Sequence, residues 1–402
     1  MSASHDLRMR ARAWLEANVP TEWRGATAET HGEDEFRKIR WAWGKKLHEG
    51  GWLGLSWPKQ HGGQGLSLID EVTFGEEEAR AKAPNFINRN SVFYIGPTIG
   101  AHGTDAQKRR YLPKILSCEE AWCQGYSEPE AGSDLFALRT SAVHRDGTWI
   151  INGQKVWITQ GCDADFCYLL ARSHPDRPRH LGISAFIVDM RAKGVTARPI
   201  TTITGSHEFA EVFFEDVEVP DDHVLGELGE GWKVATTTLA YERSTNFFAR
   251  VNYFYEQVGD VAKLARVTER NGKPAIEDAM IAERLAKSRE DAEALRRVIY
   301  RYLPAWAENR NPGPESSVIK VMWSEAHQRL LALALDVLGP AAQQRLDRGA
   351  IAGGFWPNMY LFARAETIYA GTSEVQRNVI AQRMLGLPKA DRPERSEGAR
   401  TK

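Results

Sequence analysis

The sequence predicts an α+β fold in which helices come first, strands follow and helices return. Helical periodicity dominates residues 1–120, strand and hairpin signals dominate residues 121–228, and helical periodicity resumes over residues 229–388. Strands and helices do not alternate along the chain, so a doubly wound parallel sheet is disfavoured. We therefore expect three units with these boundaries. Residues 389–402 are charged and poor in apolar side chains, and they are expected to form a disordered tail.

Length and composition agree with this reading and exclude several classes of protein. A chain of 402 residues is too long for one small core, and its 42% of hydrophobic and 26% of charged residues are ordinary for a globular protein. The formal net charge of -1 lacks the basic excess of a nucleic-acid or membrane-surface protein. The longest apolar stretch, 330–335, cannot span a bilayer, and no signal-peptide core is present. We expect a cytoplasmic protein with neither nucleic acid nor membrane as partner.

The cysteines support the same compartment. Cys118, Cys123, Cys162 and Cys167 form two pairs with a spacing of five and contain no C-x-x-C pattern, so a zinc site is not expected and no metal is predicted. We expect buried free thiols in a reducing cytosol.

The first unit is predicted to contain several helices joined by glycine-rich turns. A helix over 34–48 follows from apolar residues spaced three to four apart before a pair of glycines. The loop W-P-K-Q-H-G-G-Q-G at 57–65 separates it from a second helix over 66–83, which a proline ends. A capping box, T-x-x-Q, opens a third helix over 104–116.

The second unit is predicted to be a sheet. The dipeptides Asp-Gly at 146–147 and Asn-Gly at 152–153 are strong short hairpin signals. Further strands are expected over 181–190, 194–200 and 210–220, where β-branched and aromatic residues gather.

The third unit is predicted to be a set of long helices. One long helix is expected over 232–264, another over 277–306, and a third over 317–338, which Gly-Pro closes. The segment 309–314, N-R-N-P-G-P, is expected to be a loop. A last helix over 373–386 opens with S-x-x-Q and is followed by a proline.

Two stretches of the sheet unit carry the chemistry of a flavin site. In G-Y-S-E-P-E-A-G-S-D-L, residues 125–135, turn-forming residues expose backbone N–H groups, and two serine hydroxyls can satisfy a polar ring. In N-G-Q-K-V-W-I-T-Q-G, residues 152–161, Trp157 and Thr159 share one face of a strand. A flat aromatic beside a hydroxyl offers a bound isoalloxazine a stacking surface and a hydrogen-bond partner.

These stretches, the W-P-K-Q-H-G-G-Q-G loop and the closing I-Y-A-G-T-S-E-V-Q-R at 368–377 occur in the order of four acyl-CoA dehydrogenase motifs. Over residues 5–388 the chain resembles that family, and in particular subunits of bacterial heterotetrameric members with Ala in the Y-A-G-T motif. The resemblance implies an N-terminal helical domain, a central β-barrel-like domain and a C-terminal four-helix bundle. Its motifs are specific because all four occur together.

The resemblance also implies non-covalent FAD and the α,β-dehydrogenation of an acyl-CoA in β-oxidation or related lipid metabolism. A base removes the α-proton while the β-hydride passes to the flavin, and donors hold the thioester oxygen. Glu374 stands where other members carry Gln. By position, the residues implied to line the flavin are Tyr126, Ser127, Ser133, Trp157 and Thr159, with Thr372 and Glu374 near the adenosine half or its linker.

The chain departs from many members at Ala370, where they carry the glutamate base. The resemblance implies that the Ala370 backbone N–H still donates to the thioester oxygen. Some members place the carboxylate on the first helix of the C-terminal domain, followed by Arg, and T-L-A-Y-E-R-S-T-N-F at 238–247 matches that pattern with Glu242 and Arg243. We therefore expect Glu242 to be the base and Arg243 to order the site or contact the CoA arm.

The local pattern around Glu242 agrees with this role. Its helix face carries small residues of mixed polarity, which suits a carboxylate facing a cavity, and no Lys or Arg stands at i+4. A desolvated carboxylate with a raised pKa is the form such a base takes. Glu366, one turn before Ala370, is the alternative base, although it reads more simply as a surface carboxylate beside Arg364.

Two further stretches bear on assembly. In homotetrameric members an R-x-x-F-G stretch and a Q-x-x-G-G stretch reach the neighbour's FAD pyrophosphate. In this chain the region comparable to the first stretch, T-E-R-N-G-K-P-A-I-E-D at 268–278, lacks F-G. In the region comparable to the second, Asp336 replaces the Gln and Pro340 replaces the second Gly. A pyrophosphate would not favour Asp336 without a compensating cation. We expect an α2β2 hetero-oligomer with a related subunit, with a homotetramer as the alternative. Relatives of that kind act on bulky acyl-CoAs such as steroid side chains and ring-derived acids.

Other features remain open from the sequence. Residues 91–103 are expected to form part of the acyl wall, and an electron-transferring flavoprotein is the acceptor that the resemblance implies. The alternatives to a dehydrogenase are a flavin-dependent monooxygenase or oxidase of the same fold and a non-catalytic supporting subunit. The Glu-Arg match argues against the first, and the intact motifs at 125–135 and 152–161 argue against the second.

Overall fold

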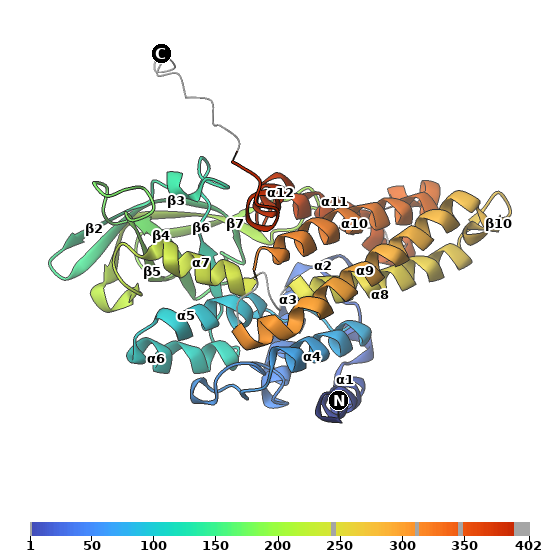
Figure 1. The fold of residues 1–402 in the computed structure, drawn as a ribbon, viewed down its shortest axis with the longest axis horizontal. Coiled ribbons are helices and arrows are strands. Elements are labelled where there is room, and N and C mark those ends of the chain that lie inside the picture. Colours follow the sequence, from blue (N-terminus) through green and yellow to red (C-terminus); the bar gives the residue numbers. More distant parts are fainter. Residues whose placement is uncertain (1, 243–246, 310–312, 345–348, 390–402) are drawn as a thin grey trace, which may run out of the picture.

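The computed structural model describes residues 2–242, 247–309, 313–344 and 349–389. It confirms the predicted order of helices, sheet and helices, and the α+β class (Figure 1). Helices α8, α9 and α10 run side by side towards one end of the molecule, and the large sheet lies at the other end. None of the described helices combines the length and the apolar character needed to cross a membrane.

The first unit contains the three helices predicted there, with ends shifted by a few residues. The predicted capping box is confirmed: Thr104 Oγ1 accepts from the Gln107 N–H at 3.2 Å, and Gln107 Oε1 accepts from the Thr104 N–H at 3.0 Å. The helices of this unit are α1 (Ser2–Asn18), α2 (Ala28–His31), α3 (Glu33–Glu49), α4 (Leu68–Arg80), α5 (Gly96–His102) and α6 (Asp105–Leu116), and the π-helical turn Ser91–Ile95 leads into α5.

The strands of the second unit form one sheet in the order β6-β7-β3-β2-β4-β5-β8, with β1 paired to β4. The predicted Asp-Gly turn joins β2 to β3, with both turn residues at positive φ. The strands are β1 (Trp122–Gly125), β2 (Ser141–Arg145), β3 (Thr148–Thr159), β4 (Phe166–Arg172), β5 (Ile183–Asp189), β6 (Val195–Ile200), β7 (Phe209–Pro220) and β8 (Val224–Leu225).

The second hairpin signal was misread. Asn152 and Gly153 lie inside β3, at an irregularity in its pairing with β7, and do not form a turn. The Asn152 side chain exchanges two hydrogen bonds of 2.9 Å with Asp216 on β7. A Cβ on Gly153 would lie 2.5 Å from Thr140 Oγ1, so the glycine is required by a close approach of another segment.

The third unit contains the predicted helices. The helix expected over 232–264 is described in two parts, α7 and α8, because residues 243–246 between them lie outside the described residues. So do 310–312 of the predicted loop and 390–402 of the predicted tail. The elements are α7 (Gly231–Tyr241), α8 (Phe247–Val267), β9 (Glu269–Arg270), β10 (Lys273–Pro274), α9 (Ala279–Asn309), α10 (Glu315–Leu338), α11 (Phe355–Phe362) and α12 (Ser373–Val379), which a π-helical turn extends to Met384.

Three hydrophobic clusters hold these units together. One joins the N-terminal helices and α7 to side chains of β4 and β5, a second lies on the other side of the sheet, and a third fills the C-terminal helices. Three of the four cysteines are buried as expected, whereas Cys162 is exposed because it lies in the turn that follows β3. All four are free thiols.

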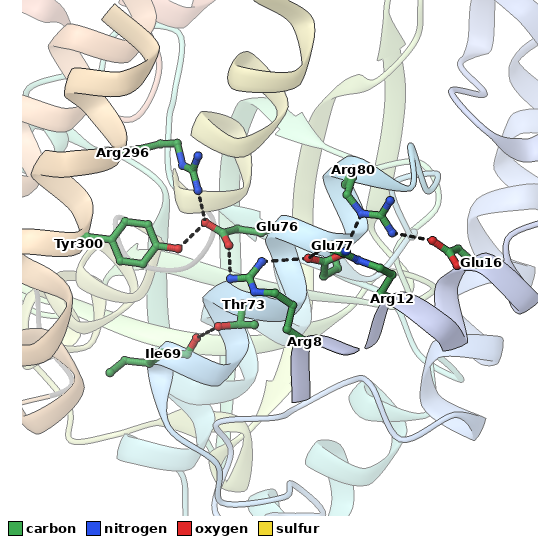
Figure 2. Close-up of polar contacts among 10 residues, drawn as sticks. All are labelled: Arg8, Arg12, Glu16, Ile69, Thr73, Glu76, Glu77, Arg80, Arg296 and Tyr300. Atoms are coloured by element: carbon green, nitrogen blue, oxygen red, sulfur yellow. Dashed lines mark hydrogen bonds and ion pairs between the residues drawn. The ribbon is translucent and has the colours of Figure 1, made fainter. Parts of the chain in front are cut away.

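A cluster of ion pairs joins α1, α4 and α9 (Figure 2). The buried Glu77 carboxylate accepts from Arg8 at 2.9 Å, from Arg12 at 2.9 Å and from Arg80 at 2.8 Å. Burial favours its neutral form, but the hydrogen bonds from the three guanidinium groups outweigh that effect and lower the pKa of Glu77 to about 2. The neighbouring Glu76 contacts α9, where Arg296 and Tyr300 donate to its Oε1.

Candidate active site

The corner that leads into α12 is held by hydrogen bonds between side chains and backbone. Ala370 and Gly371 both take left-handed conformations, with φ of 53° and 85°. Gln376 Nε2 donates to the Ala370 carbonyl at 2.8 Å, and Thr372 caps α12 by accepting from the Val375 N–H at 3.2 Å. A Cβ on Gly371 would fall 2.4 Å from Gln376 Nε2, so the corner needs glycine there.

The Ala370 backbone remains open to a ligand. No hydrogen bond from its N–H is found in the part of the chain that the structure describes, and the residue is only partly buried. The Thr372 hydroxyl has its acceptor role in the cap, and Glu374 lies exposed in the first turn of α12. The corner therefore offers a ligand the Ala370 N–H, and the Thr372 hydroxyl, which accepts in the cap, still has a proton to donate.

Glu242 lies at the end of α7 and is partly buried. It is close enough to two groups from other elements to affect their ionisation. Burial, and to a smaller extent the charge of Glu242, raise the pKa of Tyr94 well above its ordinary value. Burial opposes the charged form of Arg250, but Tyr369, Glu366 and Glu242 together keep the pKa of Arg250 above its ordinary value. Arg243, the residue expected to assist Glu242, lies outside the described residues.

Arg250 links the Glu242 region to the Ala370 corner. Its Nη1 donates to the hydroxyl of Tyr369, the residue before Ala370. Its guanidinium lies 5.0 Å from the Tyr369 ring centre and 5.3 Å from that of Trp323, so two aromatic rings flank the charge. Sequence reasoning missed Arg250, although an arginine inside the apolar run F-F-A-R-V was a usable signal.

Glu366 is not the surface carboxylate that the sequence suggested. It is 2% exposed, and His327 Nδ1 lies 2.9 Å from both of its carboxylate oxygens. Arg364 instead donates through Nε to the Tyr360 carbonyl. His327 stands 39 positions earlier on α10, so its contact with Glu366 could not be read from local spacing.

The two flavin-type motifs are joined by a buried ion pair that sequence reasoning also missed. Lys155 Nζ donates to Glu128 Oε1 at 2.8 Å and to the Tyr126 carbonyl at 3.1 Å. Glu128 in turn accepts from the backbone N–H groups of Arg139 and Thr140 at 2.6 and 2.9 Å. The pair fixes the 125–135 loop against β3. Both residues stand inside the quoted motifs, where a Glu and a Lys of opposite charge were visible.

Tyr126 is buried and points away from solvent. Its hydroxyl donates to the Tyr168 hydroxyl at 2.8 Å, and the Thr238 hydroxyl donates to Tyr168 at 3.4 Å. The Tyr126 side chain therefore fixes the loop against Tyr168 on β4.

A bulge in β3 turns the Trp157 side chain towards solvent. Its φ is 61°, the pairing with β7 shifts between Lys155 and Ile158, and the side chain is 60% exposed. Ile158 is buried and Thr159 partly buried, which agrees with Trp157 and Thr159 facing the same way. The Ser127 carbonyl accepts from the Val156 N–H at 2.9 Å.

The side chains exposed on these two motifs are of types that can hold a flavin. An exposed indole offers a flat apolar face, and the hydroxyls of Thr159, partly exposed Ser127 and exposed Ser133 offer polar contacts. The sequence had assigned the same residue types to that role.

Three family models match the chain in succession. They are the N-terminal domain of acyl-CoA dehydrogenase over residues 2–119, its middle domain over 123–217 and its C-terminal domain over 229–385. The acyl-CoA dehydrogenase IpdE1 of Mycobacterium tuberculosis is 39% identical, with 97% of this chain and 99% of the relative covered.

Solved structures are also similar to this chain over almost its full length. The structure described as "Tcur3481-Tcur3483 steroid ACAD" matches with a TM-score of 0.86 and 31% identity, over 97% of this chain and 99% of that one. The ChsE4-ChsE5 complex from Mycobacterium tuberculosis matches with a TM-score of 0.82 and 32% identity, over 97% and 99%.

Proposed function

This chain belongs to the acyl-CoA dehydrogenase family, and we propose that it dehydrogenates a bulky acyl-CoA thioester, branched or ring-containing, such as a steroid side chain. The family supports an oxidoreductase acting on a CH–CH bond. The names of the steroid-type neighbours support the bulky acyl group. The observation that carries the proposal is the position of Arg250, which donates to Tyr369 beside Ala370 and whose pKa is kept high by the charges of Tyr369, Glu366 and Glu242.

In the proposed reaction Glu242 takes the α-proton onto a carboxylate oxygen. The Ala370 N–H donates to the thioester oxygen, where negative charge develops as the proton leaves. Arg250 holds Tyr369, and through it the residue next to that donor. The chemistry that FAD supplies when bound is acceptance of the hydride from the β-carbon.

The residues proposed to hold FAD come from three elements. Trp157 would stack on the flavin ring, and the Thr159 hydroxyl would form a hydrogen bond at the edge of that ring. Ser127 and Ser133 on the 125–135 loop would offer their hydroxyls to it. Tyr126 would act by fixing that loop from behind. Thr372 and Glu374 on α12 are proposed to lie near the adenosine half or its linker.

The proposed partners are acyl-CoA, an electron-transferring flavoprotein and a related subunit in an α2β2 assembly. Asp336 has the compensating cation that the sequence argument required, because Arg284 pairs with its carboxylate within the chain. The Arg284–Asp336 pair is neutral overall, so it neither repels a pyrophosphate nor offers it a net positive charge. A homotetramer therefore remains the alternative, and co-purification of the neighbouring gene product decides between them.

Glu242→Gln tests the catalytic proposal. The variant should retain FAD while the rate of flavin reduction by acyl-CoA falls on the order of 10²- to 10⁴-fold, because the base is lost and the shape is kept. Glu366→Gln is the matched control and should reduce the rate far less. A panel of straight, branched, aromatic and steroid acyl-CoAs identifies the substrate.

Three outcomes would contradict the proposal. Retained activity in Glu242→Gln would transfer the role of base to another group. Fast oxygen consumption by the reduced protein would favour the oxidase alternative. A colourless protein, even when produced together with its partner, would favour a supporting subunit.

A further inference from the structure

Four buried hydroxyl groups follow one another between the sheet and the helices packed on it. They belong to Tyr126, Tyr168, Thr238 and Thr98. The Tyr168 hydroxyl accepts from Tyr126 at 2.8 Å and from Thr238 at 3.4 Å. The hydroxyl oxygens of Thr238 and Thr98 lie 3.0 Å apart. We call these four side chains the hydroxyl row.

The hydroxyl row is almost completely removed from solvent. Tyr168, Thr238 and Thr98 are 0% exposed, and Tyr126 is 8% exposed. The two tyrosines belong to the hydrophobic cluster that joins the N-terminal helices and α7 to β4 and β5. A hydroxyl in such surroundings is costly unless it has a hydrogen-bond partner. Because hydrogen bonds are directional, the row fixes how its four backbone segments lie against one another, which apolar contact alone does not do.

The hydroxyl row connects two parts of the proposed active site. Tyr126 stands in the flavin-type loop at 125–135, directly before Ser127. Thr238 lies on α7, one helical turn before Glu242, and residues four apart in a helix share a face. Tyr168 on β4 contacts both Tyr126 and Thr238. The row therefore ties the loop proposed to hold the flavin to the helix proposed to carry the base.

The other end of the row reaches the expected acyl wall. Thr98 on α5 donates to the Tyr94 carbonyl at 2.7 Å, and both residues stand within 91–103. Burial, and to a smaller extent the charge of Glu242, raise the pKa of Tyr94, so the Glu242 carboxylate is close enough to interact with this segment. The flavin-type loop, the base helix and the acyl wall are thus joined by one set of buried hydrogen bonds.

We infer that Tyr168 and Thr238 are positioning residues for the proposed reaction. Their hydroxyls hold α7 against β4 and the flavin-type loop, and so set where the Glu242 carboxylate stands relative to the α-carbon of the acyl group. Neither hydroxyl takes or gives the α-proton. Displacing a group by about 1 Å can slow a reaction about 100-fold, so the loss of one hydroxyl should be visible in the rate of proton abstraction. The inference rests on the proposed function and adds the residues that position its base.

Exchange of α-protons with D2O measures the base without hydride transfer. The probe is 3,3-dimethylbutanoyl-CoA, a branched thioester that carries α-hydrogens but no hydrogen on its β-carbon. Glu242 takes an α-proton, the carboxyl proton exchanges with a deuteron of the solvent, and that deuteron returns to the α-carbon. Mass spectrometry of the probe gives the exchange rate on the FAD-loaded protein, with its partner subunit where one co-purifies. Glu242→Gln gives the background rate.

Two nearly isosteric variants each remove one hydroxyl of the row. In Tyr168→Phe and in Thr238→Val, the exchange rate at saturating probe should fall about tenfold. The half-saturating probe concentration and the bound FAD should stay within about twofold of wild type. A general loss of folded protein would lower the FAD content as well, so this split separates a positioning role from a structural one. Thr238→Ser restores the hydroxyl and should keep at least about half of the wild-type rate.

Thr73→Val is the matched control. Thr73 is also buried and donates to the carbonyl four residues earlier, Ile69, as Thr238 does to Val234, but it lies on α4 outside the hydroxyl row. Its exchange rate should stay within about twofold of wild type. Tyr126→Phe combined with Thr238→Val shows whether the row acts as a unit. The double variant should be at most about twofold slower than Thr238→Val, because either change alone interrupts the row.

Exchange at the wild-type rate in both Tyr168→Phe and Thr238→Val would overturn the inference and leave the proposed function standing. An equal loss in Thr73→Val, or a Thr238→Ser rate as low as that of Thr238→Val, would overturn it as well. Should Thr238→Val fail to fold, Tyr168→Phe and Thr238→Ser carry the test. The proposed function fails separately: if the wild-type protein exchanges no faster than Glu242→Gln, Glu242 is not the base, and the inference falls with it.

Discussion

Replacing Glu77 by Gln should destabilise the contact of α1 with α4. The carboxylate is 2% exposed and its pKa lies at about 2, against an ordinary value of 4.5. A difference of about 2.5 units corresponds to about 3.4 kcal/mol, at about 1.36 kcal/mol per unit. The partner arginines are 31% to 38% exposed, so solvent screens part of this energy. We therefore expect a loss of about 2 kcal/mol at neutral pH.

Urea unfolding of the wild-type and Glu77→Gln proteins measures this loss. Because the folded state lowers the pKa of Glu77, its contribution is fully present above the unfolded value of about 4.5 and is lost as the pH falls towards 2. The difference between the two proteins should therefore shrink from pH 5 to pH 3. Glu16→Gln removes an exposed partner of Arg80 and should change stability by less than about 0.5 kcal/mol. A Glu77→Gln difference of that small size, or one independent of pH, would show that the Glu77 carboxylate does not stabilise the fold through its three arginine partners.

Two further substitutions test the parts of the site. Lys155→Met should leave the Glu128 charge buried and unpaired, which lowers the free energy of unfolding by about 3 kcal/mol and reduces the FAD retained on purification. An unchanged melting temperature would contradict this expectation. Lys233→Met, which removes an exposed ion pair, is the control. Gly371→Ala should displace the corner, because φ is 85° and the new Cβ would lie 2.4 Å from Gln376 Nε2. Flavin reduction should slow while FAD absorbance persists, and unimpaired reduction would show that the corner geometry does not matter.

Local patterns explain most of the secondary structure that could be predicted. The capping box at Thr104 and the Asp-Gly turn between β2 and β3 involve residues within four positions of each other, so the sequence shows all the interacting groups. Asn152-Gly153 shares the turn signature but pairs with β7. Its partner Asp216 is 64 positions away, and nothing in the local sequence reveals it.

The candidate site likewise contains residues that local sequence patterns revealed and residues that they did not. The motifs that carry Trp157, Ala370 and Glu242 were visible because each is a contiguous stretch of sequence. Arg250 was missed because Tyr369, which accepts its hydrogen bond, stands 119 positions later. Glu366 was misjudged for the same reason, since burial depends on what packs over a residue.

The order of the three units, the family resemblance and the residue types of the flavin-type motifs can all be predicted from the amino-acid sequence. Caps, turns and apolar periodicity act over one or two helical turns, so they can be read without a fold. Folding in three dimensions determines which polar groups are buried and paired: Lys155 with Glu128, His327 with Glu366, and Glu78 with Arg89. Removing a charge from water is costly, so each of these groups depends on a partner that only chain folding brings near.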